Sequence, residues 1–113
     1  WPGQVTFIFT KKASCKLPYL DDSVAIRIPD NTTALKILRE YNSPLAVTSA
    51  NRSGHPPVLH PDQLDQKHLK NISVIVSDDS PVSGNPSTIV DIRSDVPDII
   101  RQGTVIFRDS LQE

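Results

Sequence analysis

The chain has 113 residues, which is the size of one domain or of part of one. Lys and Arg total 12 and Asp and Glu total 13, so the net charge of −1 excludes a strongly basic, histone-like nucleic-acid binder. Apolar residues make up 37% and charged residues 22%, a composition that excludes a disordered chain. No run approaches the roughly 18 apolar residues of a membrane helix, so we expect no membrane partner. The single Cys15 excludes an internal disulfide and any multi-Cys metal site, and it fits a reducing compartment.

Two features of the sequence predict an incomplete domain. The chain contains no Met, and it opens directly on Trp1-Pro2-Gly3, which is typical of a turn that feeds a strand rather than of a loose polar terminus. The residues given include no charged and apolar signal segment. We therefore expect a single domain over residues 1–113 that lacks its N-terminal portion and is located in the cytoplasm.

The chain mixes strand and helix patterns along its length. Apolar runs rich in β-branched and aromatic residues predict strands, and apolar residues at helical spacing predict helices. The first half contains predicted strands at 5–9, 24–28 and 45–48, a helix at 32–41, and loops at 11–22 and 49–60. The second half contains a predicted helix at 61–69, strands at 72–76, 88–92, 98–101 and 104–107, and a loop at 77–86. This mixture favours an α/β or α+β domain with a mixed sheet and flanking helices.

Two local signals set boundaries within this pattern. The helix predicted at 32–41 has Asp30 or Asn31 as its cap, and Pro44 follows its end. Gln102-Gly103 separates the last two predicted strands and indicates a tight hairpin turn.

Several familiar kinds of site find little support in the sequence. The adjacent pairs Asp21-Asp22 and Asp78-Asp79 favour solvated loop carboxylates over a catalytic dyad. No Gly-x-Ser-x-Gly elbow, phosphate-binding loop or dinucleotide fingerprint occurs. We expect no metal site, because no carboxylate or Cys stands at metal-ligand spacing from the three histidines, His55, His60 and His68.

The most unusual segment is TSANRSG at 48–54, directly after a predicted strand. In an open α/β sheet, ligands bind in the crevice beyond the strand ends. Ser49 and Asn51 are two residues apart, so in an extended chain both side chains face one side, a hydroxyl beside an amide. This pair suits a ligand rich in oxygen and nitrogen. The alternative is a polar loop held by Asx or Ser turns.

Arg27 and Arg101 are candidates for binding an anion. Arg27 lies between Ile26 and Ile28 in a predicted strand, so its side chain faces the side opposite to theirs. Arg101 follows an apolar pair and precedes the predicted turn. A guanidinium matches a carboxylate or a phosphate in two parallel bonds, and plain surface exposure is the alternative at each position.

Five motifs follow one another along the chain: WPGxVT at 1–6, VAIRIPD at 24–30, TSANxSGxP at 48–56, PSTIVD at 86–91 and IRxG at 100–103. Together, in this order, they resemble the YrdC family, the threonylcarbamoyl-AMP synthases. The resemblance covers nearly the whole chain but only the later part of the family domain. The earlier part carries a Lys-x-Arg motif that joins the Ser and Asn of Ser-x-Asn in the active site. The resemblance thus implies a YrdC-like twisted mixed sheet and half of that constellation, so we expect the chain to be inactive alone.

The resemblance implies a nucleotidyltransferase that makes threonylcarbamoyl-AMP and pyrophosphate from L-threonine, bicarbonate and ATP. Mg²⁺ enters as the ATP complex, with no tightly bound cofactor, and the product supplies a threonylcarbamoyl transferase complex in tRNA modification. By motif, the implied active-site pair is Ser49 and Asn51. The implied threonine and carbamate contacts are Thr6, Arg27, Ser49 and Ser87, and the implied ATP contacts are Asn51, Arg101 and Ser23.

Two residues depart from the family pattern. Gln4 stands where the family has a second Pro, and Leu59 stands where it tends to have Ser or Thr as a nucleotide contact.

Two other functions stay open. One alternative is a module that binds tRNA or double-stranded RNA, for which the net charge of −1 is unfavourable although three lysines cluster at 11–16. The other is the YrdC-like domain of a carbamoyltransferase in hydrogenase maturation.

Overall fold

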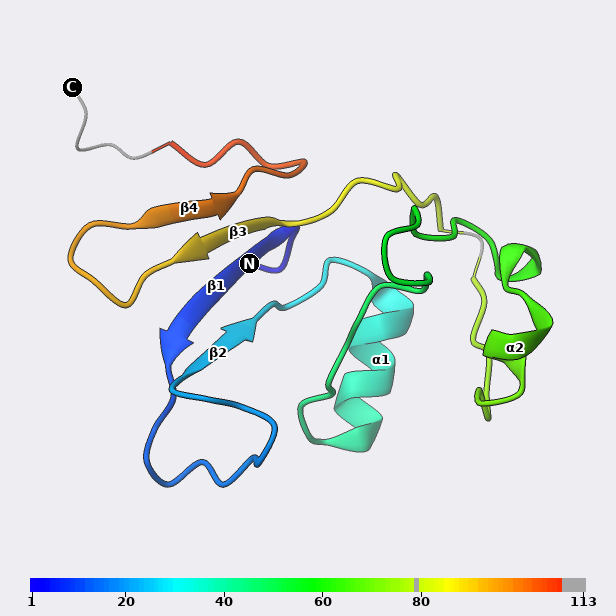
Figure 1. Ribbon diagram of the computed structural model, residues 1–113, viewed down its shortest axis with the longest axis horizontal. Coiled ribbons are helices and arrows are strands. Elements are labelled where there is room, and N and C mark those ends of the chain that lie inside the picture. Colours follow the sequence, from blue (N-terminus) through cyan, green and yellow to red (C-terminus); the bar gives the residue numbers. More distant parts are fainter. Residues whose placement is uncertain (79, 109–113) are drawn as a thin grey trace. The chain divides into compact units, whose positions relative to one another are not determined.

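The computed structural model describes residues 1–78 and 80–108. The chain forms two compact units, and each is described by itself. The first unit comprises Trp1–Asp30 together with the described residues from Asn85 onward, and the second comprises Asn31–Gly84. The first unit contains the strands and the second contains the helices (Figure 1).

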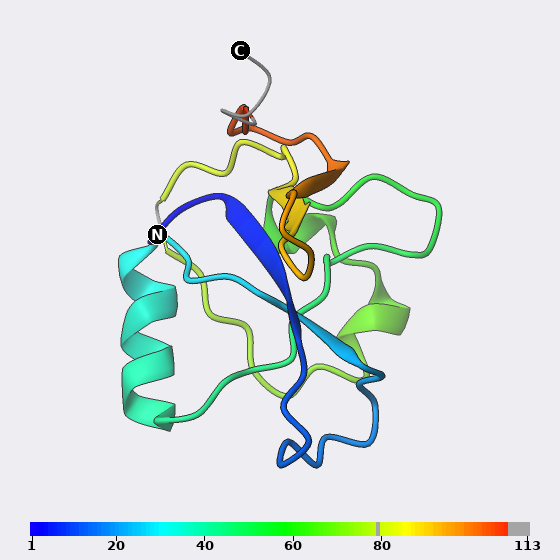
Figure 2. The same ribbon diagram turned by 90° about the vertical axis from the view of Figure 1, so that its left-hand side faces the viewer.

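The first unit is built on a four-stranded mixed sheet with the strand order β2-β1-β3-β4 (Figure 1). β1 pairs antiparallel with β2 and parallel with β3, and β3 pairs antiparallel with β4. The loop that joins β1 to β2 extends well beyond the ends of both strands (Figure 2). The mixed sheet, together with a helix elsewhere in the chain, confirms the predicted α+β class. The strands are β1 (Val5–Thr10), β2 (Ser23–Ile26), β3 (Thr88–Asp91) and β4 (Asp98–Arg101).

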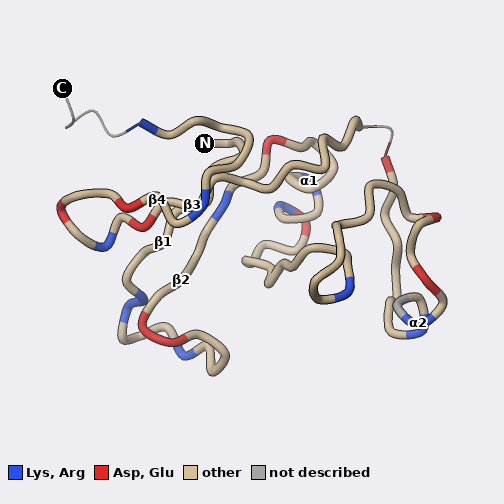
Figure 3. The backbone as a smooth tube through the Cα atoms, turned by 45° about the horizontal axis from the view of Figure 1, so that its top comes forward, with Lys and Arg blue, Asp and Glu red and all other residues tan. Residues whose placement is uncertain are grey.

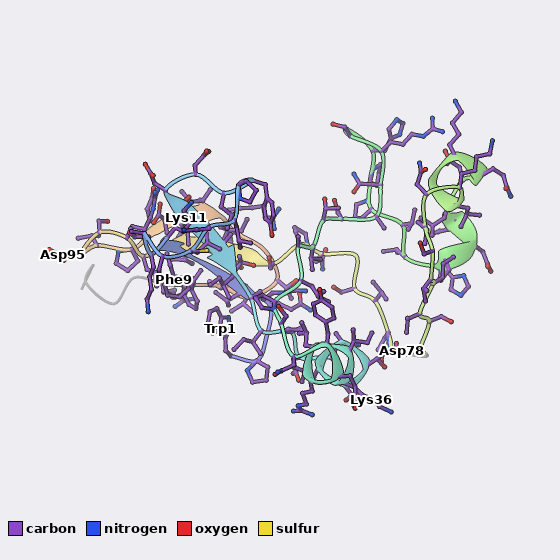
Figure 4. All side chains as sticks on the ribbon, turned by 90° about the horizontal axis from the view of Figure 1, so that it is seen from below. Trp1, Phe9, Lys11, Lys36, Asp78 and Asp95 are labelled. Atoms are coloured by element: carbon purple, nitrogen blue, oxygen red, sulfur yellow. The ribbon has the colours of Figure 1, made fainter. Side chains whose placement is uncertain are left out.

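One face of the sheet is apolar and aromatic, and we call it the Phe7 face. Phe7 pairs with Val90, whose side chain is fully buried. The Trp1 ring centroid lies 5.2 Å from that of Phe7 and 6.2 Å from that of Phe9, and Figure 4 shows Trp1 and Phe9 on the same side of the sheet. The Phe107 ring lies 6.2 Å from Phe7. These aromatic rings gather on one face of the first unit, and Val90 is the buried apolar side chain among the described residues.

The opposite face carries Thr6, and we call it the Thr6 face. Successive strand residues point to opposite faces, so Thr6 and Ile8 lie on this side. Thr6 pairs with Ile89 on β3, and Ile8 pairs with Ala25 on β2.

The second unit contains α1 (Thr32–Tyr41), the short 3₁₀ helix η1 (Pro61–Gln63) and α2 (Gln66–Leu69). Asn31 caps α1, since its Oδ1 accepts a hydrogen bond of 2.7 Å from the Ala34 amide. α1 ends at Asn42, which takes the left-handed conformation with φ 52° and donates its N–H to the Leu38 carbonyl. Both ends confirm the predicted helix. Within the part of the chain that the structure describes, no helix is long and apolar enough to span a membrane.

Three predicted strands, at 45–48, 72–76 and 104–107, are wrong. These stretches form no ladder with any described strand. A strand is stabilised only when a neighbour takes up its N–H and C=O groups, and apolar alternation along one segment does not supply that neighbour. Their side chains are correspondingly exposed, with Val47 at 84%, Val74 at 74% and Ile106 at 69%.

The predicted helix at 61–69 is interrupted. The Gln63 side chain accepts hydrogen bonds from the Leu59 and His60 amides, which closes a capping box around η1. Leu64 then adopts extended angles, φ −70° and ψ 129°, so the chain leaves the helical path before α2 begins. The capping interactions end the first turn after three residues, and one continuous helix is wrong.

Two further boundaries differ from the sequence prediction. The strand predicted at 24–28 is β2, which ends at Ile26 and leaves Arg27 just beyond it. The hairpin turn at Gln102-Gly103 is wrong because no strand follows it. Instead, the Gly103 backbone packs against the backbone at the start of β3, and its N–H donates to the Thr88 hydroxyl at 2.9 Å.

Candidate substrate-binding site

The Thr6 face carries two hydroxyls and a guanidinium where β3 begins, and we call these three side chains the Thr6 cluster. Thr6 Oγ1 and Ser87 Oγ are 2.8 Å apart and share a hydrogen bond. Arg101 donates from Nε (3.1 Å) and Nη2 (2.9 Å) to the Ser87 carbonyl, and Nη2 also donates to Ser87 Oγ at 3.4 Å. Thr6 and Ser87 are half-buried and Arg101 is exposed. The structure therefore brings together three residues that the sequence analysis proposed separately.

The backbone behind the Thr6 cluster is fixed by the segment that follows β4. The buried Thr88 hydroxyl accepts from the Gly103 N–H and donates to the Val105 carbonyl. A Cβ at Gly103 would lie 2.5 Å from the Ser87 carbonyl carbon and 2.6 Å from the Thr88 nitrogen, with the Pro86 oxygen closer still. Only glycine fits there. The sequence analysis missed the supporting roles of Thr88 and Gly103, although the Gly of the IRxG motif was a signal for close backbone approach.

Arg27 and Ser23 stand at opposite ends of β2. Arg27 follows Ile26, the partner of Phe7, so strand alternation assigns Arg27 to the Thr6 face at the end of β1 where Thr6 lies. Its side chain is exposed. Ser23 pairs with Thr10, four residues along β1 from Thr6, which is about 13 Å at the rise of a strand. Arg27 thus lies at the same end of the sheet as Thr6, whereas Ser23 lies at the opposite end.

The second unit holds Ser49 and Asn51 in a loop. The Asn51 amide group donates to the Arg52 carbonyl (3.0 Å) and the His55 carbonyl (2.8 Å), and its backbone N–H donates to the Ser49 carbonyl (3.1 Å). The chain turns between Ser49 and Asn51, so the expected extended segment with both side chains on one side is wrong. The segment is a polar loop, as the alternative interpretation described, but the Asn51 side chain holds it by donating to two carbonyls and not through an Asx turn. The buried Asn51 Oδ1 accepts no hydrogen bond from the described residues.

The second unit also has an open cavity of about 570 Å³ near the start of α1. Its lining includes Thr33, Leu59 and Asp78, and Figure 4 shows Asp78 beside α1. Hydrogen bonds to the Asp78 carboxyl lower its pKa below the usual value. The Thr33 side chain makes the largest contribution, and the backbone and side chain of Ser80 come next. The described lining includes none of the predicted site residues.

The histidines and acidic residues do not form a metal centre in the described part of the chain. Among residues 1–78 and 80–108, no three His, Cys, Asp or Glu side chains gather as metal ligands. His60 instead lies 3.1 Å from the Asp62 carboxylate. Asp79 and the side chain of His68, both named in the sequence analysis, lie outside what the structure describes.

Comparison with known proteins places this α+β chain in a family. The Sua5/YciO/YrdC family model, described as telomere recombination, matches residues 1–103, and the chain therefore belongs to that family. It is 32% identical over 108 residues to the threonylcarbamoyl-AMP synthase of Bacillus subtilis, covering 93% of this chain and 31% of that protein. It is 31% identical over 105 residues to the threonylcarbamoyl-AMP synthase of Vibrio parahaemolyticus, covering 91% of this chain and 56% of that protein. The chain thus spans from 31% to 56% of the length of these relatives. No solved structure matches it.

Proposed function

We propose that the protein containing this chain is a threonylcarbamoyl-AMP synthase, which converts L-threonine, bicarbonate and ATP into threonylcarbamoyl-AMP and pyrophosphate. The observation that carries the proposal is the Thr6 cluster in a chain of this family. Two hydroxyls and a guanidinium on one sheet face suit carboxylate, carbamate and phosphate oxygens. The product would supply tRNA modification through a threonylcarbamoyl transferase complex, in the cytoplasm.

The reaction requires positioning and charge neutralisation more than a tuned base. The threonine amine and bicarbonate give a carbamate and water. A carbamate oxygen then attacks the α-phosphorus of ATP, which arrives as its Mg²⁺ complex, and the bond to pyrophosphate breaks. We assign the threonine and carbamate contacts to Thr6, Arg27, Ser49 and Ser87. We assign the ATP contacts to Asn51, Arg101 and Ser23.

Arg27 offers the sharpest test of this assignment. A guanidinium binds a carboxylate through two parallel bonds, whereas a lysine offers a point charge. In the protein that contains this chain, Arg27→Lys should raise the KM for threonine about tenfold or more, the effect of losing one charged hydrogen bond, and move the KM for ATP less. The assay is threonine- and bicarbonate-dependent pyrophosphate release.

The matched control is Arg39→Lys, in the exposed last turn of α1, which should change neither constant. Absence of threonine-dependent pyrophosphate release by the unmodified protein would refute the proposed function. A rise in the KM for ATP alone would show that Arg27 contacts the nucleotide and not threonine.

The RNA-binding alternative gains no support from the charges. The β1–β2 loop carries Lys11, Lys12 and Lys16, but acidic residues share the same loop (Figure 3). The Lys11 ammonium donates to the Leu20 carbonyl at 2.9 Å, which holds the loop together. A mixed-charge loop of this kind gives little of the phosphate attraction on which RNA binding depends.

A further inference from the structure

Thr88 is a polar side chain buried at the start of β3. It is fully buried, as is Val90 two residues along the strand, so both side chains lie on the Phe7 side of the sheet. Ser87, the residue before it, lies on the Thr6 side, where its hydroxyl meets that of Thr6. A hydroxyl buried on an apolar face is costly unless it is hydrogen-bonded. The partners of the Thr88 hydroxyl therefore indicate what this side chain does.

The Thr88 hydroxyl is bonded to the segment that follows β4. Its Oγ1 accepts a hydrogen bond of 2.9 Å from the Gly103 N–H, and its proton is donated to the Val105 carbonyl. The backbone adds another bond between the same two segments, since the Thr104 N–H donates to the Pro86 carbonyl at 3.2 Å. A valine at position 88 would have nearly the same shape but could neither donate nor accept. The hydroxyl thus joins the chain after β4 to the start of β3.

The two segments that Thr88 joins carry residues assigned to different substrates. Ser87, assigned to threonine and its carbamate, immediately precedes Thr88, and Arg101, assigned to ATP, stands two residues before Gly103. The Arg101 guanidinium also donates to the Ser87 carbonyl, from Nε at 3.1 Å and from Nη2 at 2.9 Å. A shift of one segment against the other would therefore move the Ser87 and Arg101 side chains apart.

From this geometry we infer that Thr88 is a positioning residue that sets the spacing between the threonine side and the nucleotide side of the site, an inference that rests on the proposed function. In the proposed reaction a carbamate oxygen attacks the α-phosphorus of ATP, so the two substrates have to be held at reacting distance. Thr88 itself faces the buried side of the sheet and acts through Ser87 and Arg101. A misplacement of about 1 Å at such a site can cost about a hundredfold in rate.

Three variants of the protein that contains this chain test the inference. Thr88→Val removes the hydroxyl, and we expect the KM for threonine and the KM for ATP both to rise about tenfold or more, because the two segments are no longer joined by its hydrogen bonds. Thr88→Ser keeps the hydroxyl and should bring both constants to within about threefold of those of the unmodified protein. Thr104→Val removes an exposed hydroxyl from the same segment, and as the matched control it should change neither constant.

A purely structural role of the hydroxyl predicts a different result. Thr88→Val would then lower kcat through a smaller folded fraction while both KM values stayed unchanged, and this outcome would overturn the inference. A rise in one KM alone would also overturn it, because Thr88 would then serve one substrate and not the spacing between two. Thr88→Ala takes the place of Thr88→Val if the valine variant folds poorly.

A second readout does not depend on activity. In the ¹⁵N-labelled protein, the Gly103 amide should exchange with solvent at least about tenfold more slowly than that of the exposed Gly54, because it donates to the buried Thr88 hydroxyl. Thr88→Val should remove most of this protection, and Thr88→Ser should keep it. Exchange at Gly103 as fast as at Gly54 would overturn the inference. If the unmodified protein shows no threonine-dependent pyrophosphate release while Gly103 is protected, the proposed function fails and the Thr88–Gly103 contact stands.

Discussion

Replacing Gly103 by alanine tests the packing that supports the Thr6 cluster. The added methyl carbon would lie 2.5 Å from the Ser87 carbonyl carbon and 2.6 Å from the Thr88 nitrogen. Carbon contacts are favourable only near about 3.5–4 Å, so several atoms must move by about 1 Å. Overpacking costs about 1–3 kcal/mol and occasionally more. Because the opposing atoms are backbone and cannot change rotamer, we expect a loss of about 3 kcal/mol in the free energy of unfolding.

Urea denaturation of the protein that contains this chain measures this loss. The fluorescence of Trp1, which packs on Phe7, reports unfolding of the first unit. Gly3→Ala is the matched control, because a Cβ there meets nothing within 4 Å, and it should change stability by less than about 0.5 kcal/mol. A Gly103→Ala loss as small as that of the control would show that the chain after β4 moves away from Pro86 at little cost, contrary to the packing argument.

Two other substitutions test local interactions. Asn31→Ala removes the cap of α1 and should lower the free energy of unfolding by about 1 kcal/mol in urea, whereas an unchanged midpoint would contradict the capping role. Arg93 hydrogen-bonds to Asp91 and lowers the pKa of that carboxyl below its ordinary value of 3.8. The ionised Asp91 therefore stabilises the fold above pH 3.8 and loses that contribution as the pH falls through its folded pKa. In urea titrations between pH 5 and pH 2, the free energy of unfolding of the Asp91→Asn variant should fall less steeply with decreasing pH than that of the unmodified protein. An equally steep fall in both proteins would refute the stabilising role of the ionised Asp91.

Elements stabilised by local interactions could be predicted from the sequence. The α1 helix begins and ends where expected because its two boundary signals, the Asn31 cap and the Pro44 that follows its end, lie within a few residues of the helix. β1, β3 and β4 were placed to within a residue, since their β-branched and aromatic runs are bounded by turn residues.

Features that depend on distant partners could not be predicted. The stretch at 45–48 has the same apolar character as β1, but a strand also requires a neighbour, and Val47 is 84% exposed. Another such feature is the β-bulge in β4, where Val90 pairs with Ile99 but Ile89 pairs with Arg101. The sequence does not reveal it, because it exists only in the register with β3.

The candidate site was predictable in composition but not in geometry. Motif resemblance selected Thr6, Ser87 and Arg101, and the structure joins all three by hydrogen bonds. Resemblance did not indicate that Arg101 contacts Ser87, because a motif does not show how β4 is placed beside β3. The extended segment expected at Ser49 and Asn51 was wrong, since the pattern of alternate polar residues assumes an extended chain, whereas the chain turns there.

The parallel pairing of β1 with β3 has a consequence for how the protein is made. The Thr6–Ser87 hydrogen bond joins residues that are 81 positions apart, whereas β1 and β2 are neighbours that can pair as soon as both exist. Closing so long a loop costs more chain entropy than closing a hairpin, and contacts of this range form late in folding. On the ribosome, the first two strands emerge well before Ser87 and Arg101 have been synthesised. We therefore expect the nascent chain to carry a paired β1–β2 hairpin with an incomplete Thr6 face, which gains its guanidinium only when β4 has left the exit tunnel.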